Sequence, residues 1–305
     1  PRIWVKRDDL SDCALSGNKI RKLEFSLAQA LDEGADTLVT CGGLQSNHCR
    51  ATALLGARLG LRVELLLRGE PAGTPDGNLF LDRLAGATVH ACPAPRYQRE
   101  RDALLEALAS RLRAEGRRPF LIPTGASDGI GVWGYVAACA ELAADFALAG
   151  IDPRVVVCAT GSGGTQAGLT AGLRIYGLRA EAWGMAVCDD ADWFRAKVRA
   201  DLAEWRQRYG VALDTDALAV NVLDDYIGAG YAQASPEVFA TIGLAARSEG
   251  LLLDPVYTGK AFHGMLQEIR GGRFRDETDI VFVHTGGLFG LFAQREQALA
   301  GGALG

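Results

Sequence analysis

The sequence predicts an α/β fold in which parallel β-sheets are covered by helices on both faces. Short apolar runs, typical of buried strands, alternate with stretches of helical periodicity along most of the chain. At least three of these strands end in glycine, and a helix begins directly afterwards. Ligands of open α/β sheets bind at such carboxyl ends of strands. Many of the 38 glycines among the 305 residues therefore lie where a functional site is expected.

The individual elements follow from apolar periodicity and from the turn residues between them. We expect strands at residues 37–41, 61–67, 87–91, 120–122, 154–159, 181–187 and 280–284. We expect one helix to begin near residue 18, another to follow the strand at 37–41 and end near residue 59, and a third to follow the strand at 154–159 and end at residue 176. Further helices are expected at 78–85, 100–114, 132–148, 192–208, 236–248 and 259–269. No repeat, low-complexity linker or long charge block interrupts this order.

The composition, 49% hydrophobic and 23% charged, is that of an ordinary globular protein. With 37 acidic and 32 basic residues the net charge is −5. This balance disfavours nucleic acid or an anionic membrane as the main partner, because both require clustered lysine and arginine. Apolar runs such as 65–67 and 155–159 are too short to span a bilayer.

The cysteines and histidines show no metal-binding pattern. The count of seven cysteines is odd and none has C-x-x-C spacing, which argues against a disulfide framework or a zinc site. Scattered cysteines are typical of reduced, cytosolic thiols, and no basic and apolar leader follows Pro1. We therefore expect a cytoplasmic protein without a metal site. No G-x-S-x-G elbow and no pair of carboxylates stands out.

Residues 16–24 read Ser-Gly-Asn-Lys-Ile-Arg-Lys-Leu-Glu and open a helix that Ser16 or Asn18 can cap. Three cations then lie in the first turn, where the helix dipole disfavours positive charge. A solvated basic turn is one interpretation. The other is that one lysine works as a free amine, because a helix N-terminus and neighbouring cations lower a lysine pKa, as Schiff-base chemistry requires.

Residues 41–48 read Cys-Gly-Gly-Leu-Gln-Ser-Asn-His at the end of a strand. Unpaired backbone N–H groups at the following helix start form an anion site, and Ser46 and Asn47 add neutral donors suited to a carboxylate. Simple capping by Ser46 or Asn47 is an equally supported alternative. For His48 we favour a helix-start residue hydrogen-bonded to the backbone over a catalytic base.

Residues 160–165 read Thr-Gly-Ser-Gly-Gly-Thr between a buried strand and a helix. Consecutive glycines let backbone N–H groups converge on a phosphate, and Ser162 and Thr165 add hydroxyls. The dinucleotide fingerprint fails because Gln166 stands where its third glycine belongs, and the Gly-Lys-Ser/Thr of a Walker loop is missing. The segment predicts a cup for one phosphate, with a structural tight turn as the alternative.

Two further segments carry weaker signals. Residues 254–260, Asp-Pro-Val-Tyr-Thr-Gly-Lys, place Tyr257 before a helix, where it either faces the same crevice or packs at a domain seam. Residues 284–287, His-Thr-Gly-Gly, end the last strand, where Thr285 is either a hydrogen-bond partner or a turn residue.

Together and in this order, the five segments resemble the tryptophan-synthase-β-like (fold type II) enzymes that use pyridoxal 5′-phosphate (PLP). The most similar branch contains D-cysteine desulfhydrase and 1-aminocyclopropane-1-carboxylate (ACC) deaminase. The resemblance runs from residues 5–9, Val-Lys-Arg-Asp-Asp, to Gly287. The motifs Ser-Gly-Asn-Lys-x-Arg-Lys-Leu-Glu and Gln-Ser-Asn-His are specific in combination, whereas the glycine cup alone is weak.

The resemblance implies how the cofactor would be held. Lys19 would bind PLP covalently and then move the Cα proton of the substrate. Thr285 would meet the pyridine nitrogen, and Asn47 would lie near the phenolic oxygen. The phosphate would be bound by Gly161, Ser162, Gly163, Gly164 and Thr165.

The resemblance also implies the substrate side and the catalytic groups. Ser46, Asn47 and the N–H of His48 would hold the substrate carboxylate. Tyr257 and Tyr231 would line the substrate side. Lys19, Ser46 and Tyr257 would be the catalytic residues.

Two departures separate the branches. ACC deaminases are expected to carry glutamate after the tyrosine that matches Tyr257, whereas this chain has Thr258. A hydroxyl at Thr285 would leave the pyridine nitrogen neutral, which suits β-elimination with a good leaving group. The resemblance, including residues 65–70, therefore favours a carbon–sulfur lyase that converts D-cysteine to pyruvate, ammonia and sulfide. L-cysteate, with sulfite as leaving group, and ACC are the alternatives. A non-catalytic or non-PLP phosphate-binding protein is the alternative of a different class.

For the architecture we expect two open, mostly parallel, twisted sheets. A small α/β domain at 22–135 would be inserted in a larger, PLP-binding domain formed by 1–21 and 136–305. The site would lie in the cleft between them, the usual place for a small-molecule site. The resemblance implies a homodimer and a small amino-acid substrate.

Overall fold

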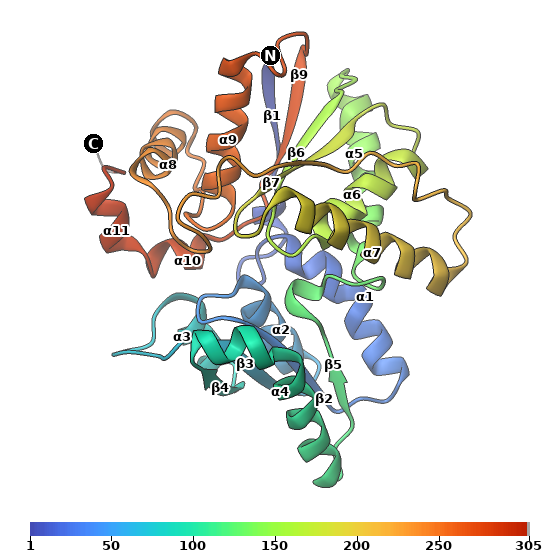
Figure 1. The fold of residues 1–305 in the computed structure, drawn as a ribbon, viewed down its shortest axis with the longest axis vertical. Coiled ribbons are helices and arrows are strands. Elements are labelled where there is room, and N and C mark those ends of the chain that lie inside the picture. Colours follow the sequence, from blue (N-terminus) through green and yellow to red (C-terminus); the bar gives the residue numbers. More distant parts are fainter. Residues whose placement is uncertain (304–305) are drawn as a thin grey trace.

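A computed structural model describes residues 1–303 and contains two sheets (Figure 1). The first sheet consists, in spatial order, of β1 (Arg2–Lys6), β9 (Asp279–Val283), β6 (Val155–Thr160), β7 (Glu181–Ala186) and β8 (Asn221–Leu223). The second consists of β4 (Thr88–Cys92), β3 (Arg62–Arg68), β2 (Thr37–Gly43) and β5 (Pro119–Leu121). The pairings within both sheets are parallel, so the predicted fold class is confirmed.

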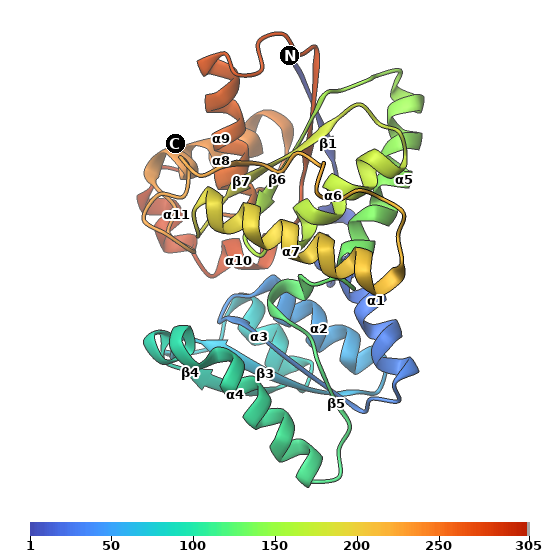
Figure 2. The ribbon, with the colours of Figure 1, turned by 45° about the vertical axis from the view of Figure 1, so that its right-hand side comes forward.

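Helices cover the faces of both sheets (Figures 1 and 2). Those around the first sheet are α5 (Val132–Ala149), α6 (Gly164–Ile175), α7 (Ala191–Tyr209), α8 (Pro236–Glu249), α9 (Thr258–Gly271), α10 (Leu288–Phe292) and α11 (Arg295–Ala300). Those beside the second are α2 (Asn47–Arg58), α3 (Gly77–Leu84) and α4 (Ala94–Ala114). Each sheet and the helices around it form one layer of the molecule. The remaining helix, α1 (Asn18–Asp32), contacts both α2 and α5 and so joins the two layers.

Each strand and helix that the sequence predicts is present, and within residues 1–303 the structure adds the short helices α10 and α11 and two strands. β1 lies at the edge of the first sheet, where Arg2 pairs with Asp279 and Lys6 with Val283. β8 is a three-residue edge strand. α4 begins at Ala94, six residues before its predicted start, and Pro95 stands in its first turn, where the missing N–H of proline leaves no helix hydrogen bond unmade.

The predicted domain boundaries fall inside helices. The boundary at 21/22 lies within α1, and that at 135/136 lies within α5. The strands of the second sheet, residues 37–121, all lie inside the predicted range 22–135. The two helices therefore run through the junction between the layers and bring its residues together.

α5 is long and apolar enough to span a membrane by composition, although the short apolar runs of the sequence do not suggest it. In the fold this helix packs against α6. A Cβ on Gly168 of α6 would lie 2.6 Å from the Val132 carbonyl oxygen, and one on Gly172 would lie 2.6 Å from Cys139 Sγ. Its buried residues include Tyr135, Leu142 and Phe146, so α5 is a core helix of the first layer.

A buried carboxylate fixes α1 against α5. Asp8, which is 2% exposed, accepts hydrogen bonds from Arg21 Nε at 3.0 Å, from Arg21 Nη2 at 2.9 Å and from Tyr135 Oη at 2.6 Å. Directly beside this network Gly134 of α5 meets the α1 backbone, since a Cβ there would lie 2.6 Å from the Arg21 carbonyl carbon and 2.7 Å from Lys22 N. The start of α1 is thus held rigidly.

The Gly134 crossing can be tested by substitution. Gly134→Ala forces α1 and α5 apart, so we expect a loss of about 1–3 kcal/mol in the free energy of unfolding, the usual cost of overpacking. The measurement is the thermal unfolding midpoint. Gly271→Ala in α9 is the matched control, because nothing lies within 4 Å of the added Cβ. Equal midpoints for the two variants would contradict this account of the crossing.

Candidate active site

A cavity of about 540 Å³ lies between the two layers, within the range of small-molecule sites. Strand ends of both sheets open into it: Gly42 and Gly43 of β2, Arg68 of β3, and Gly161 directly after β6. Thr285, two residues beyond β9, completes this set. The carboxyl ends of strands from both sheets therefore face one space.

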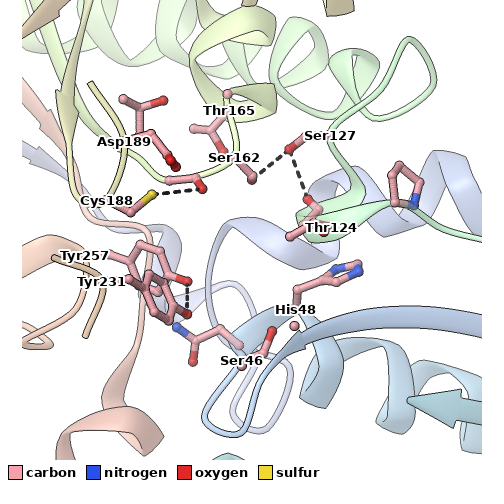
Figure 3. A pocket seen from close by; sticks show the side chains of 18 of the residues that line it. Ser46, His48, Thr124, Ser127, Ser162, Thr165, Cys188, Asp189, Tyr231 and Tyr257 are labelled. Atoms are coloured by element: carbon pink, nitrogen blue, oxygen red, sulfur yellow. Dashed lines mark hydrogen bonds between the residues drawn. The ribbon is translucent and has the colours of Figure 1, made fainter. Parts of the chain in front are cut away.

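Eleven of the twelve predicted site residues line this cavity: Lys19, Ser46, Asn47, His48, Gly161, Ser162, Gly163, Thr165, Tyr231, Tyr257 and Thr285. The exception is Gly164, whose N–H donates to Ser127 Oγ at 3.2 Å. In Figure 3 the hydroxyls of Ser162 and Thr165 lie on one side of the cavity, and Ser46 and His48 lie on the opposite side.

Lys19 lies in the first turn of α1, which begins where two backbones nearly touch. Gly17 is the N-cap residue with φ of 104°, and a Cβ on it would overlap the Thr285 carbonyl oxygen. Asn18 N donates to that same oxygen at 3.2 Å. The prediction that Ser16 or Asn18 caps the helix is wrong, because Ser16 Oγ donates to Asp9 O and Asn18 Nδ2 to Thr165 Oγ1.

The lysines of this turn are buried, so the solvated-turn interpretation is wrong for them. Lys19 is 9% exposed and Lys22 is fully buried. Burial lowers the pKa of Lys19 to about 8. Burial, followed by the charge of Lys19, holds the pKa of Lys22 well below its usual range. Lys19 is therefore a partly unprotonated amine at mildly alkaline pH, as nucleophilic chemistry at a carbonyl requires.

Ser127 joins the glycine cup to the lysine pair. Its hydroxyl is 2.8 Å from Ser162 Oγ and accepts from Lys22 Nζ at 3.1 Å. Lys197 Nζ donates to its carbonyl oxygen at 2.9 Å. The cup at the start of α6 thus combines backbone N–H groups and hydroxyls with two nearby lysine side chains, a donor set that fits a phosphate dianion.

The loop between β2 and α2 forms the wall of the cavity opposite the glycine cup. Ser46 Oγ caps this helix by accepting from Cys49 N at 3.2 Å, and the residue also lines the cavity. Asn47 Oδ1 is held by Asn78 Nδ2 at 3.0 Å and by Arg50 Nη1 at 3.4 Å. Because these partners occupy the oxygen, the amide nitrogen is the end of Asn47 that is available to a ligand.

His48 is buried beneath this loop, and its predicted backbone partner is wrong. Its Nε2 lies 2.8 Å from Thr40 Oγ1, a side-chain hydroxyl. Burial, and then the charges of Lys19 and Lys22, hold the pKa of His48 well below its usual range. The imidazole is therefore neutral and orients the helix start, whereas its backbone N–H is the group suited to an anion.

Tyr231 and Tyr257 form the third wall (Figure 3). Their hydroxyl oxygens are 2.7 Å apart, and their rings meet edge to face with centroids 5.9 Å apart. Burial raises the pKa of Tyr231 to about 12 and holds that of Tyr257 well above its usual range, so both are protonated at neutral pH. The Arg68 guanidinium lies 4.7 Å from the Tyr231 ring centroid.

Sequence reasoning missed several residues of the cavity, including Thr124, Ser127, Cys188, Asp189 and Lys197. The first two belong to residues 123–127, Pro-Thr-Gly-Ala-Ser, which follow a predicted strand just as the other glycine turns do. Their position directly after a predicted strand was the signal that could have identified Thr124 and Ser127 as site residues. Lys197 lies inside α7, where the sequence offers none.

The residues present fit PLP. The cup supplies phosphate donors, and Lys19 supplies a buried amine of lowered pKa across the cavity. Gly125, with φ of 70°, lets the chain pass between them, since a Cβ there would overlap Ser162 Oγ and lie 3.3 Å from Lys19 Nζ. Two parallel sheets with such a lysine between a phosphate cup and an anion-binding loop define a PLP-dependent enzyme of fold type II.

Comparison with known proteins agrees with this class. Residues 1–286 match the family described as "Pyridoxal-phosphate dependent enzyme". The chain belongs to this family, and its relatives identify it as a PLP-dependent lyase.

Three similar proteins show how far the likeness extends. The chain is 39% identical to the mitochondrial bifunctional D-cysteine desulfhydrase/1-aminocyclopropane-1-carboxylate deaminase of Arabidopsis thaliana, over 97% of this chain and 74% of that protein. It is 44% identical to D-cysteine desulfhydrase of Yersinia pestis (strain Pestoides F), over 97% and 89%. A crystal structure of an ACC deaminase homologue superposes with a TM-score of 0.88 at 35% identity, covering 98% of this chain and 88% of that chain.

The lowered pKa of Lys19 predicts how apoenzyme reacts with PLP. Only the unprotonated amine attacks an aldehyde, and with a pKa of about 8 that form predominates above pH 8. We expect the reconstitution rate, followed by visible absorbance, to rise with pH up to about 8–9 and then level off. Nα-acetyl-lysine in the same buffers corrects for titration of PLP itself. A rate that keeps rising to about pH 10, as for an ordinary lysine, would contradict the assignment.

Proposed function

We propose that this PLP-dependent lyase eliminates sulfide from D-cysteine, and that the released aminoacrylate reacts with water in solution to give pyruvate and ammonia. The observation that carries the proposal is the position of Lys19 between the phosphate cup and the loop of Ser46 and Asn47, in one cavity. The relatives named D-cysteine desulfhydrase support the substrate. The specific site roles below are part of the same proposal.

Each wall of the cavity has a role in this reaction. Bound PLP supplies the electron sink that makes the Cα–H bond acidic. Ser46, the Asn47 amide and the His48 N–H bind the substrate carboxylate. Lys19 Nζ takes the Cα proton as the Cβ–S bond breaks and sulfide leaves with its electron pair. Tyr231 and Tyr257 close the substrate side and exclude water.

The phosphate and pyridine ends of the cofactor are assigned in the same way. We propose that the phosphate is bound by Gly161, Ser162, Gly163 and Thr165, with Gly164 acting through Ser127. Thr285 is 6% exposed and lines the cavity, and we propose that its neutral hydroxyl would meet the pyridine nitrogen. A neutral partner leaves the ring a weaker electron sink, which favours a substrate with its own good leaving group.

Thr258 argues against ACC as the substrate. Its hydroxyl donates to Asp254 Oδ1 at 2.7 Å and accepts from Asp254 N at 2.8 Å, so it is part of the buried start of α9. The residue does not line the cavity. The carboxylate that the resemblance associates with ACC deamination is therefore missing at this position.

Arg68 favours L-cysteate as a second candidate. The guanidinium lies against Tyr231 at the cavity wall, and none of the hydrogen bonds among residues 1–303 involves it. An unpaired guanidinium beside the substrate side suits a sulfonate, which binds arginine through charge-assisted hydrogen bonds. D-cysteine has no sulfonate and therefore needs no arginine at this position.

We further propose that residues 22–135 act as a smaller unit that closes over the substrate. The Arg68–Tyr231 contact, which joins β3 to the loop after β8, crosses the cavity and would strengthen on closure. We also propose a cytoplasmic homodimer whose partner is a small amino acid and which binds neither nucleic acid nor membrane. The resemblance supports this assembly, and light scattering of the purified protein measures it.

Lys19→Ala tests the covalent attachment of the cofactor. We expect the purified variant to lack the visible absorbance of the lysine-bound cofactor and to produce no detectable pyruvate from D-cysteine. Lys6→Ala is the control, because Lys6 pairs with Glu141 and Asp145 away from the cavity and should leave colour and turnover unchanged. Turnover retained in Lys19→Ala would overturn the assignment.

A substrate panel separates the two candidates. Pyruvate is measured with D-cysteine, L-cysteine, L-cysteate and ACC, together with sulfide or sulfite. We expect D-cysteine to be the best substrate, and we expect Arg68→Met, which also removes the closing contact to Tyr231, to lower its turnover less than that of L-cysteate. Any L-cysteate activity should fall about tenfold or more in that variant, because a charge-assisted hydrogen bond contributes about 1.5–3 kcal/mol. If the enzyme releases sulfite from L-cysteate but no sulfide from D-cysteine, L-cysteate replaces D-cysteine as the proposed substrate.

A further inference from the structure

Lys260 is a buried cation that the proposed reaction does not use. It lies in α9, three residues after Tyr257, and is 1% exposed. Burial lowers the pKa of Lys260 to about 8, so at neutral pH the side chain is an ammonium with three protons. A buried ammonium is tolerated only when its protons have acceptors, so its partners indicate what it does.

The acceptors are backbone carbonyls of two other segments. Lys260 Nζ donates to Ile227 O and Gly230 O, each at 2.7 Å, and to Val187 O at 3.4 Å. Residues 224–235 form no helix or strand, and Gly230 and Ala232 have φ of 122° and 60°. A segment without regular structure has few hydrogen bonds of its own, so this ammonium is a main anchor for it.

The anchored carbonyls are next to residues that line the cavity. Gly230 precedes Tyr231, and Val187 precedes Cys188. Lys260 itself shares the first turn of α9 with Thr258, directly after Tyr257. The ring of Tyr257 has little room to move on the side of the glycine cup, because a Cβ on Gly161 would lie 2.9 Å from Tyr257 Cε1. A shift of residues 227–230 would therefore break the 2.7 Å contact between the two tyrosine hydroxyls.

We propose that Lys260 is a positioning residue that fixes Tyr231 against Tyr257 and so shapes the substrate side of the cavity. The proposal rests on the proposed function in that these tyrosines contact the amino-acid substrate. Lys19 lies on α1, and the glycine cup lies between β6 and the first turn of α6; Lys260 donates to neither of them. Loss of the ammonium should therefore weaken substrate binding and leave PLP bound.

Lys260→Met tests this, because methionine keeps an unbranched chain of similar length but has no donor. Met265→Ala is the matched control: Met265 is fully buried one turn later in α9 and does not line the cavity. Hydrogen–deuterium exchange of the holoenzymes should show faster exchange in residues 224–235 for Lys260→Met only. Both variants should keep the visible absorbance of bound PLP.

Amino-acid affinity, read from the change in that absorbance on binding, gives the second readout. We expect it to fall about 10- to 100-fold in Lys260→Met, the effect of a misplaced contact residue, and to stay unchanged in Met265→Ala. On a Tyr231→Phe background, Lys260→Met should cost no more than about a further twofold, because both changes act on the same wall.

Two results would overturn the proposal. The first is that Lys260→Met and Met265→Ala show the same hydrogen–deuterium exchange and the same amino-acid affinity. The second is that the losses of affinity caused by Lys260→Met and Tyr231→Phe are fully additive in the double variant. Lys260→Gln, which keeps two N–H donors, should give intermediate values and replaces the methionine variant if that variant does not fold. A wild-type holoenzyme whose absorbance responds to no amino acid would instead contradict the proposed function, while the exchange measurement would still test Lys260.

Discussion

Three glycines near Lys19 lie so close to neighbouring segments that a Cβ atom would have no room. Gly17 lies against the Thr285 carbonyl, Gly125 against Ser162, and Gly134 against the α1 backbone at Arg21. Gly17 and Gly125 also have positive φ, which side-chain-bearing residues rarely adopt. These three contacts bring the start of α1, the end of β9 and the glycine cup to one place. The lysine, the phosphate donors and Thr285 depend on them for their mutual distances.

Charge is concentrated around the same place. The chain has five lysines, and four of them, Lys19, Lys22, Lys197 and Lys260, line the cavity or are buried behind it. Burial of so many ammonium groups is unfavourable unless anions or carbonyl oxygens accompany them. Lys197 has Asp201 and Lys260 has three carbonyls. Lys19 and Lys22 face the cup, which is consistent with a phosphate-bearing cofactor that reacts with an amine.

The strand-to-helix turns and the buried lysine could be predicted because each has a local signature. Glycine pairs after apolar runs marked the strand ends, and the unfavourable cations of residues 19–22 marked the first turn of α1. Ser127, Arg68 and the hydrogen bonds of Lys260 could not be predicted, because they depend on which segments the fold places side by side. The cap of α1 by Asn18 was mispredicted for the same reason, because Asn18 finds its partner, Thr165, on a segment that is distant in the sequence, whereas Ser16 bonds to the nearby Asp9.

Of the five lysines, we expect only Lys19 to react with the cofactor. Borohydride reduction of the yellow holoenzyme, followed by proteolysis and mass spectrometry, tests it most directly because the reduced cofactor stays attached to its lysine. The account predicts a single phosphopyridoxyl group, on the peptide that contains Lys19. A modification found on Lys22, Lys197 or Lys260 instead, or none at all in a protein that carries PLP, would contradict it.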